Sequence, residues 1–457
     1  MRPATLAEAA GAMGADLSNA RAGTIVGGAA IDSRKVREGD LFFALRGRTD
    51  GADFAPEAHL RGAVATVATR PLDVPTLVVD DPEKALQKLA RWTLVRPDAP
   101  SPTVVGITGT VGKTTTKDAL ATILRHAGMR VSATEGNLNN ELGLPLTVLS
   151  ADPRTEVLVL EMGATHAGDI EHLCSIAPPE IGVLTAISPV HLDSFGSLEG
   201  LAAAKGELAL ALPESGTFIA PAGAPERATG SGRELGRRIT FAREGDADLV
   251  ASGIEGREEG LRFLATIGGE SAEVRSPVFG THLVNPLLAA LGGALALGLD
   301  LGVAAGGLAR LRRTGLRGDV YRLKEDIVVY DDSYNASPAA VAAVLRYGAE
   351  QASGQGRRLV VVLGGMFELG PCAREYHREA GRLAEEVGVD LLVCVGDEAR
   401  WYAEAFSGKT LFYEDAVTAA DALRYRLRGG DYLIVKGSRG VGLDTLTHKL
   451  RESLALV

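Results

Sequence analysis

The sequence predicts an α/β protein of three domains, and three observations support this prediction. The chain has 457 residues, which is too long for one hydrophobic core and favours two to four domains. Short apolar, β-branched runs alternate with helical patterns along much of the chain, as they do in parallel α/β sheets. Two breaks in this pattern divide the chain into pieces of residues 1–98, 99–314 and 315–457.

The composition excludes several classes of protein. A formal net charge of −10 argues against a general nucleic-acid binder. The three cysteines, Cys174, Cys372 and Cys394, provide neither a disulfide framework nor a zinc-binding spacing, which predicts a reducing, cytoplasmic location. The most apolar stretch, 287–299, is shorter than the ~20 residues that span a bilayer. We therefore expect a buried helix there and no membrane insertion.

The first piece, 1–98, is predicted to be a mixed α/β domain. Its candidate strands are 40–45, 63–69 and 75–80. Three prolines within the seven residues 96–102 predict a linker to the second piece.

The second piece, 99–314, is predicted to contain a parallel sheet. The runs 103–107, 156–162 and 181–187 are apolar throughout, as strands buried on both faces are. The segments between them are long enough for crossover helices. A basic run containing glycine follows, and we expect a hinge at 312–319.

The third piece, 315–457, repeats this pattern on a smaller scale. Apolar runs at 327–331, 358–365, 390–396 and 431–437 alternate with helical stretches. This alternation predicts a Rossmann-like domain.

Residues 106–118, GITGTVGKTTTKD, predict a phosphate-binding loop between the first central strand and a helix at 114–126. The glycines allow a tight turn whose N–H groups face a phosphate, and Lys113 adds a positive charge. The strict P-loop pattern has four residues between its first glycine and Gly-Lys. That pattern would require glycine at Ile107, so this loop departs from it by one residue.

Polar residues follow two of the central strands. Glu161 lies at the end of 156–162, and His191 comes just after 181–187. Ligands of open parallel sheets bind at the carboxyl ends of the strands, so we expect Thr114, Glu161 and His191 to converge beside the phosphates. Such a set suits Mg²⁺, which prefers oxygen ligands. The alternative for Glu161 is a solvated strand end.

A series of stretches along nearly the whole chain resembles the Mur ligases, ATP-dependent amide-forming enzymes of peptidoglycan synthesis. TGTVGKTTTKD is similar to their ATP loop, and DSRKVREGDLFFALRGRTDGADF resembles their uridine-binding segment. Six further stretches resemble the branch that adds D-alanyl-D-alanine to a UDP-muramoyl tripeptide. They are GNLNNELGLPLTVL (136–149), EMGATHAGDIEHL (161–173), VHLDSFGSLEGLAAAKGEL (190–208), YDDSYNASPAAVAAVL (330–345), LGGMFELG (363–370) and VKGSRGVGLD (435–444).

The resemblance implies a function. The chain is expected to be a monomeric, cytoplasmic ligase that uses ATP and two Mg²⁺ ions and forms an acyl phosphate, ADP and phosphate. Its partners would be the two small-molecule substrates, UDP-muramoyl tripeptide and D-alanyl-D-alanine. The first domain would bind the uridine end, the central domain ATP, and the third domain would complete the ligase site.

The resemblance also implies site residues. Lys113, Lys205 and His191 are expected to be catalytic. Thr114 and Glu161 would hold one Mg²⁺, and His191 and a carbamoylated Lys205 a second; the alternative for Lys205 is a solvated helix residue. ATP binding is implied for Thr108, Gly109, Thr110, Val111, Gly112, Lys113, Thr114, Thr115, Asn285, Arg317 and Asp332. Substrate binding is implied for Ser33, Arg34, Asn137, Asn139, Asn335, Ser337 and Lys436.

Some residues depart from the family pattern, and these departures leave other functions open. The family has GxHNxxNxLAA where this chain reads GTHLVNPLLAA (280–290), so Leu283 and Pro286 replace both asparagines. This departure allows a nucleotide-dependent switch without ligase activity. Folylpolyglutamate and cyanophycin synthetases share the loop and the Lys205-type residue, and a simple kinase is a further alternative. His377 is either a base for the incoming amine or a surface histidine.

Overall fold

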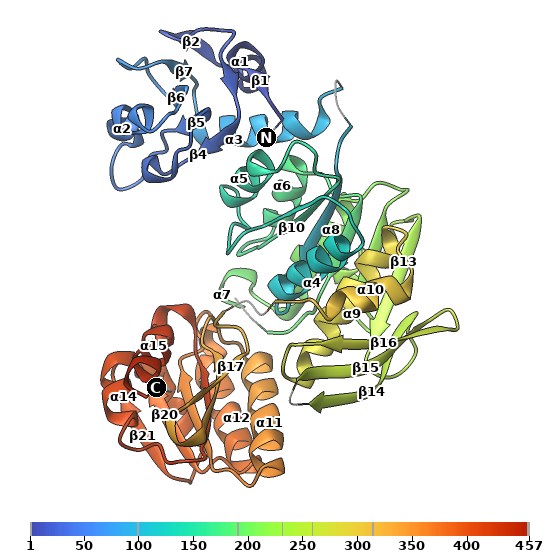
Figure 1. Ribbon diagram of the computed structural model, residues 1–457, viewed down its shortest axis with the longest axis vertical. Coiled ribbons are helices and arrows are strands. Elements are labelled where there is room, and N and C mark those ends of the chain that lie inside the picture. Colours follow the sequence, from blue (N-terminus) through green and yellow to red (C-terminus); the bar gives the residue numbers. More distant parts are fainter. Residues whose placement is uncertain are drawn as a thin grey trace.

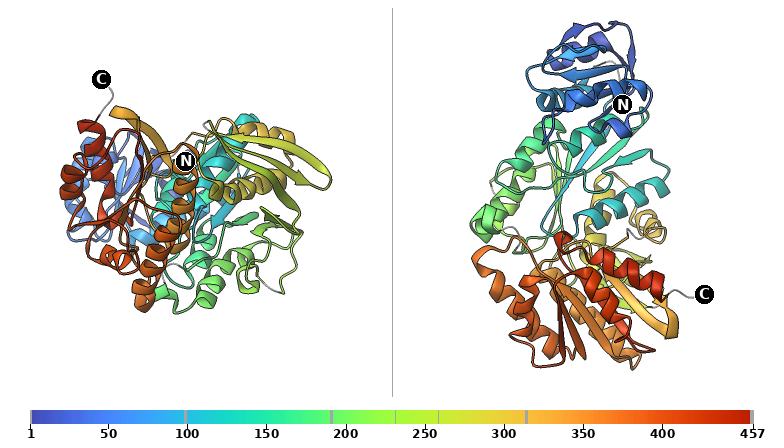
Figure 2. Two further views of the ribbon diagram at one scale, coloured as in Figure 1. Left: turned by 90° about the horizontal axis from the view of Figure 1, so that it is seen from below. Right: turned by 90° about the vertical axis from the view of Figure 1, so that its left-hand side faces the viewer.

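The computed structural model describes residues 2–97, 100–189, 192–230, 232–257, 259–312 and 315–454. Three α/β domains follow one another along the long axis of the molecule (Figures 1 and 2). The predicted fold class is confirmed. The domain boundaries at 98 and 314 fall outside the described residues and stay predictions.

The first domain contains a five-stranded sheet with strand order β2-β7-β6-β5-β4. Strands β4 to β7 are parallel, and β2 adds an antiparallel edge. Short strands β1 (Ala4–Thr5) and β3 (Ile25–Val26) form a separate antiparallel pair. The other elements are α1 (Leu6–Met13), β2 (Asp16–Ser18), β4 (Gly28–Ala30), β5 (Asp40–Phe43), α2 (Ala55–Leu60), β6 (Ala65–Ala68), β7 (Thr76–Val78) and α3 (Pro82–Val95).

The central domain contains a nine-stranded sheet with strand order β16-β15-β14-β13-β12-β11-β8-β10-β9. Strands β8 to β14 are parallel, and β14 to β16 form an antiparallel extension. The strands are β8 (Thr103–Thr108), β9 (Val131–Ala133), β10 (Val157–Glu161), β11 (Ile181–Leu184), β12 (Thr217–Pro221), β13 (Arg237–Ala242), β14 (Leu249–Arg257), β15 (Gly260–Ile267) and β16 (Glu270–Ser276).

Helices cover both faces of this sheet, which explains why its inner strands are apolar throughout. Apolar cores lie on each side of β8, one shared with α5, α6 and α8 and the other with α4, α9 and α10. The helices are α4 (Lys113–His126), α5 (Gly143–Ser150), α6 (Asp169–Ile176), α7 (Leu192–Phe195), α8 (Leu198–Ala211), α9 (Val284–Ala296) and α10 (Leu301–Leu308). The buried helix expected at 287–299 corresponds to α9. No helix within the described residues has the length and apolarity required to cross a bilayer.

The third domain contains a six-stranded sheet with strand order β17-β18-β22-β19-β20-β21. All neighbouring strands are parallel except β17, which pairs antiparallel with β18. The elements are β17 (Asp319–Leu323), β18 (Ile327–Asp332), α11 (Pro338–Gly354), β19 (Leu359–Gly364), α12 (Ala373–Glu386), β20 (Leu391–Val395), α13 (Arg400–Ala403), β21 (Thr410–Tyr413), α14 (Ala416–Leu423), β22 (Tyr432–Lys436) and α15 (Leu443–Ser453).

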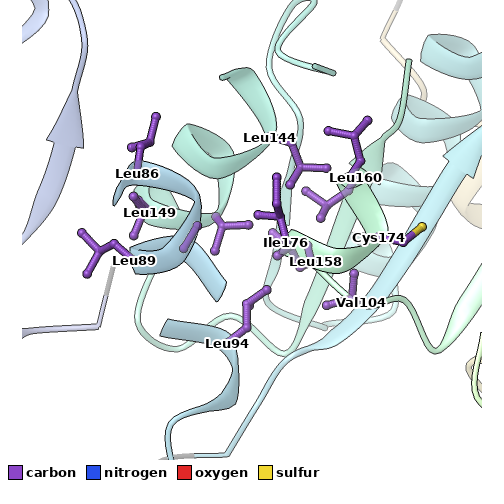
Figure 3. Packing of buried hydrophobic residues seen from close by; sticks show 14 of the residues in the cluster. Leu86, Leu89, Leu94, Val104, Leu144, Leu149, Leu158, Leu160, Cys174 and Ile176 are labelled. Carbon is purple, nitrogen blue, oxygen red and sulfur yellow. The ribbon is translucent and has the colours of Figure 1, made fainter. Parts of the chain in front are cut away.

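A single apolar core joins the first two domains (Figure 3). Leu86 and Leu89 of α3 are fully buried in the same cluster as Leu144 and Leu149 of α5. Helix α3 thus precedes the linker in sequence but packs on the central domain. We expect the first two domains to move as one unit.

Replacing Leu89 by alanine should lower the free energy of unfolding by about 2–5 kcal/mol, because it leaves a cavity in this shared core. Leu60→Ala is the control, since Leu60 is 88% exposed and surface substitutions change stability by about 0.5 kcal/mol or less. Denaturant unfolding of both variants measures the difference. Equal stability of the two variants would contradict the shared core.

Candidate active site

The loop of residues 109–112 joins the carboxyl end of β8 to the start of α4. Gly109 has φ +142°, and a Cβ there would lie 2.1 Å from Thr185 Oγ1. Gly112 has φ +84°, and a Cβ there would lie 2.9 Å from Pro286 Cγ. Both positions require glycine, because the backbone adopts positive φ values and approaches its neighbours closely.

Hydrogen bonds to the neighbouring strand ends hold this loop. The Thr110 N–H donates to Ala186 O (3.0 Å), and Thr185 Oγ1 donates to Val111 O (2.6 Å). Thr108 is buried at the end of β8. The loop is therefore fixed at the sheet edge where ligands of parallel sheets bind.

Lys113 begins α4 and folds back over the loop. Its Nζ donates to Gly109 O (2.7 Å) and Thr110 O (3.4 Å). Loss of solvation lowers the pKa of Lys113; Glu161 opposes this shift and Arg317 adds to it. Glu161 and Arg317 are thus each within electrostatic reach of Lys113, although Arg317 belongs to the third domain.

Glu161 lies at the end of β10 and is almost completely buried. Thr114 Oγ1 donates to its Oε2 (2.8 Å), and Asn139 Nδ2 donates to its Oε1 (2.9 Å). Three residues predicted from sequence therefore meet in one polar cluster. Glu161 is not the solvated strand end of the alternative reading. Asn137, by contrast, is exposed.

The oxygen atoms of this cluster are suitable ligands for Mg²⁺, because hydroxyl, carboxylate and amide oxygens are hard ligands. His191 lies outside the described residues. Within the described part of the chain, no three His, Cys, Asp or Glu side chains group in a way that could hold a metal ion. The metal roles of Thr114 and Glu161 stay predictions.

Lys205 in α8 is 2% exposed, so it is not a solvated helix residue. Its Nζ donates to Ala164 O (3.3 Å) and lies 5.4 Å from the centre of the Phe195 ring. No ion pair links it to a described carboxylate. Loss of solvation lowers the pKa of Lys205 to about 7, and the positive charge of Lys113 acts in the same direction. The negative charges of Asp169 and Glu207 oppose this shift, and the uncharged amine is more accessible near neutral pH than in a free lysine.

Lys117 was missed by the sequence analysis. It lies one turn after Lys113 in α4 and is 5% exposed. Its Nζ donates to Thr134 O (2.8 Å), and Thr134 Oγ1 accepts from the Glu161 N–H (3.0 Å). Lys117 thus fixes the segment that positions the carboxylate. The four-residue spacing from Lys113 within one helix was the available signal.

Lys117→Met should weaken the apparent affinity for Mg²⁺ about tenfold, because Glu161 loses the support of Thr134. Kinetic titration of Mg²⁺ at saturating ATP measures this effect. Lys88→Met changes an exposed lysine of α3 and should leave the Mg²⁺ dependence unchanged. An equal dependence in the Lys117→Met variant and the unsubstituted enzyme would contradict the positioning role.

Predicted residues of the third domain form a second polar cluster. Lys436 Nζ donates to Asp332 Oδ2 (2.5 Å) and to Asn335 O (2.8 Å). The guanidinium of Arg317 lies 3.9 Å from the ring centre of Tyr334. Thr115 and Arg317 line one small cavity between the two domains. Ser337 accepts the Ala340 N–H and caps α11.

His282 precedes α9 and lies next to this cluster, and Asn285 lies in the first turn of α9. Loss of solvation lowers the pKa of His282 to about 4, and the negative charge of Asp332 opposes this shift. Within the described residues, His282 Nδ1 and Asn285 Oδ1 are buried without a hydrogen-bond partner. Asn285 Oδ1 can therefore accept a hydrogen bond from a ligand, and His282 Nδ1 can accept or donate one, depending on its tautomer. Asn285 was predicted from the sequence, and His282 was not.

The predicted residues of the first domain lie apart from the loop. Ser33 Oγ donates to Glu57 Oε2 (2.9 Å) and is buried. Arg34 is exposed and pairs with Asp32 (2.9 Å). The structure records no contact between these residues and the ATP loop, and their substrate-binding roles stay predictions.

His377 is neither a surface histidine nor placed to act as a base, which corrects both sequence interpretations. It is fully buried in α12, where Nδ1 donates to Ala373 O (2.7 Å). Its Nε2 accepts the Met366 N–H (2.9 Å). Burial lowers the pKa of His377. Both ring nitrogens are occupied, so the residue orients the 366–370 loop.

Three family models match the chain in order. The model described as "Mur ligase family, catalytic domain" matches residues 26–92, and "Mur ligase middle domain" matches residues 107–294. "Mur ligase, glutamate ligase domain" matches residues 316–439.

Related proteins align with this chain over nearly its full length. The UDP-N-acetylmuramoyl-tripeptide--D-alanyl-D-alanine ligase of Escherichia coli (strain K12) is 34% identical over 431 residues, covering 92% of this chain and 93% of that protein. A crystal structure of MurF from Acinetobacter baumannii superposes with a TM-score of 0.88 at 29% identity, over 99% of both chains. The crystal structure of the MurF ligase from Thermotoga maritima in complex with ADP superposes with a TM-score of 0.81 at 32% identity, over 93% of this chain and 97% of that one. With the loop, the buried Glu161 and the three domains, these findings establish that the chain belongs to the Mur ligase family of ATP-dependent, amide-forming ligases.

Proposed function

We propose that the chain joins D-alanyl-D-alanine to UDP-N-acetylmuramoyl-tripeptide at the expense of ATP, in the synthesis of the peptidoglycan precursor. The relatives that carry this name match over more than nine-tenths of their own length. The observation that carries the proposal is the arrangement of the glycine loop, Lys113 and the Thr114–Glu161 pair, with Arg317 of the third domain within electrostatic reach.

The reaction must first activate a carboxylate, because a carboxylate and an amine at neutral pH form a salt. The terminal carboxylate oxygen of the tripeptide attacks the γ-phosphorus of ATP, and the bond to the β,γ-bridging oxygen breaks. ADP leaves, and an acyl phosphate remains. The uncharged amine of D-alanyl-D-alanine then attacks the acyl carbon, loses a proton, and expels inorganic phosphate. The protein positions the reactants and offsets negative charge.

The residues at the sheet edge have separate tasks in this proposal. The N–H groups of the loop and Lys113 bind the β- and γ-phosphates. Thr114 and Glu161 would hold one Mg²⁺, and His191 with Lys205 a second. When bound, these ions would supply positive charge next to the phosphate oxygens. In the nucleotide site, Asn285, Arg317 and Asp332 are proposed to contact the base and ribose.

Carbamoylation of Lys205 is part of the proposal. The uncharged amine attacks carbon dioxide, a C–N bond forms, and the proton leaves to solvent, which gives a carbamate. The buried side chain changes from an amine without a carboxylate partner among the described residues to an anion that can help hold Mg²⁺. The positive charges of Lys113 and Mg²⁺ would stabilise that anion.

The tripeptide end of the substrate is proposed to reach the third domain. Asn335, Ser337 and Lys436 of the third domain and Asn139 of the central domain are the proposed contacts to this end, and Ser33 and Arg34 are proposed to hold the uridine diphosphate end. The acyl phosphate would hydrolyse in water, so we propose that the third domain closes by a hinge at 312–319. A scattering curve unchanged by nucleotide and substrate would contradict this closure.

The test measures ADP release with the two substrates supplied singly and together. We expect continued ADP release over many turnovers only when UDP-muramoyl tripeptide and D-alanyl-D-alanine are both present, and none with L-alanyl-L-alanine in place of D-alanyl-D-alanine. Tripeptides with lysine or diaminopimelate as third residue, assayed in parallel, identify the acceptor. ADP formed from dihydrofolate and glutamate would favour a folylpolyglutamate-type ligase. ATP binding without turnover under every condition would favour the switch.

A further inference from the structure

A second cavity lies at the opposite edge of the central sheet from the ATP loop. Its volume is about 540 Å³, within the range of about 300–1,000 Å³ that is usual for small-molecule sites. Arg130 and Glu156 on its wall directly precede β9 and β10, and Ser101 lies two residues before β8. The cavity therefore faces the amino ends of the parallel strands. The nucleotide loop occupies their carboxyl ends.

Four arginines from separate segments line this cavity. Arg2 and Arg96 belong to the first domain, and Arg130 and Arg154 belong to the central domain. Glu156 is the acidic residue among the described lining residues. Arginine side chains bind phosphate oxygens through paired N–H groups.

Three of these arginines are held by their own neighbours, which fixes their direction. Arg154 donates from Nε to Asp152 Oδ1 and from Nη2 to Asp152 Oδ2, both at 3.2 Å. Arg130 Nε donates to Arg154 O (2.7 Å), and its Nη2 lies 3.2 Å from Glu156 Oε1. Arg96 donates from Nη1 to Pro3 O (3.2 Å) and stacks on Trp92 at 4.6 Å. Their guanidinium groups are thus placed before any ligand binds.

Arg2 provides the independent sign of a missing ligand. Its Nη1 atom is buried and has no hydrogen-bond partner within the described residues. A buried, charged donor without an acceptor is unfavourable. An anion in the cavity would satisfy this donor.

We propose that this cavity binds a small molecule with two or more linked phosphate groups. Several guanidinium groups match several phosphate oxygens, and the volume exceeds that of a single phosphate. The ligand would join residues of the first domain to the central domain. This inference does not depend on the proposed ligase reaction.

The experiment titrates inorganic pyrophosphate into the full chain by calorimetry, with saturating ADP present so that the nucleotide loop is occupied. We expect one further binding event per chain. The double variant Arg2→Gln/Arg154→Gln should weaken it at least about tenfold, because two charge-assisted contacts are lost. Arg424→Gln, which changes an exposed arginine of the third domain, should bind like the unsubstituted chain.

Three results would overturn the proposal. They are no binding event beyond ADP, pyrophosphate binding that the double variant leaves unchanged, and citrate binding as tightly as pyrophosphate with the same dependence on arginine. ADP affinity of the double variant is measured alongside, and an unchanged value shows that the variant is folded.

Discussion

Lys113→Ala is expected to reduce turnover by at least about a thousandfold while the free energy of unfolding changes little. Loss of a single donor aimed at developing charge already reduces turnover about 10²–10³-fold in enzymes, and Lys113 also supplies a full positive charge. In the structure its Nζ donates hydrogen bonds to the loop carbonyls of Gly109 and Thr110. The Lys113 side chain belongs to none of the apolar cores, so the fold should persist. Steady-state kinetics and thermal unfolding measure the two quantities.

The control for this variant is Lys409→Ala, which removes an exposed lysine of the third domain. Its turnover should equal that of the unsubstituted enzyme. A Lys113→Ala enzyme that retains a tenth of the activity would contradict the phosphate-binding role of the loop.

Lys205→Ala should abolish most turnover, and a small carboxylate such as acetate should restore part of it. The lysine is buried beside Phe195 and Ala164 without a carboxylate partner, so its removal leaves space that an added anion can enter. Because the pKa of Lys205 is lowered to about 7, the uncharged, reactive amine becomes more abundant as pH rises from 6 to 8. Incorporation of ¹³C-bicarbonate, followed by NMR, should rise over the same range.

Lys117→Ala should show no rescue by acetate, because Lys117 donates a hydrogen bond to a backbone carbonyl and is not proposed to be carbamoylated. Full activity of Lys205→Ala would exclude the carbamate. Loss of activity without rescue and without a ¹³C signal in the unsubstituted enzyme would show that Lys205 acts as an amine.

Several parallel strands could be predicted from sequence because they are buried on both faces, whereas the parallel strands β4, β9, β12, β13 and β21 were missed. β8, β10 and β11 are continuous apolar runs, as are β18, β19, β20 and β22 of the third domain. Strands β14, β15 and β16 were missed, since one of their faces is solvated and carries charged residues such as Arg262 and Glu273. Their pattern alternates and lacks the apolar runs that mark a buried strand.

The site residues could also be predicted only in part from the sequence. Thr114 and Glu161 could be paired from sequence because each ends or follows a strand of a parallel sheet. The hydrogen bond from Lys117 to Thr134 O joins residues 17 positions apart, and no spacing rule predicts it. His282 was missed because its proximity to Asp332 depends on how the third domain packs on the central domain. His377 was misread because its burial depends on the packing of α12 against α13.

The most direct test of the central claim, that the γ-phosphoryl group of ATP is transferred to a carboxylate oxygen, is to follow that oxygen. UDP-muramoyl tripeptide labelled with ¹⁸O in its terminal carboxylate is turned over with ATP and D-alanyl-D-alanine. Mass spectrometry of the released inorganic phosphate should find one ¹⁸O per amide bond formed. Phosphate without the label, alongside the amide product, would contradict the account.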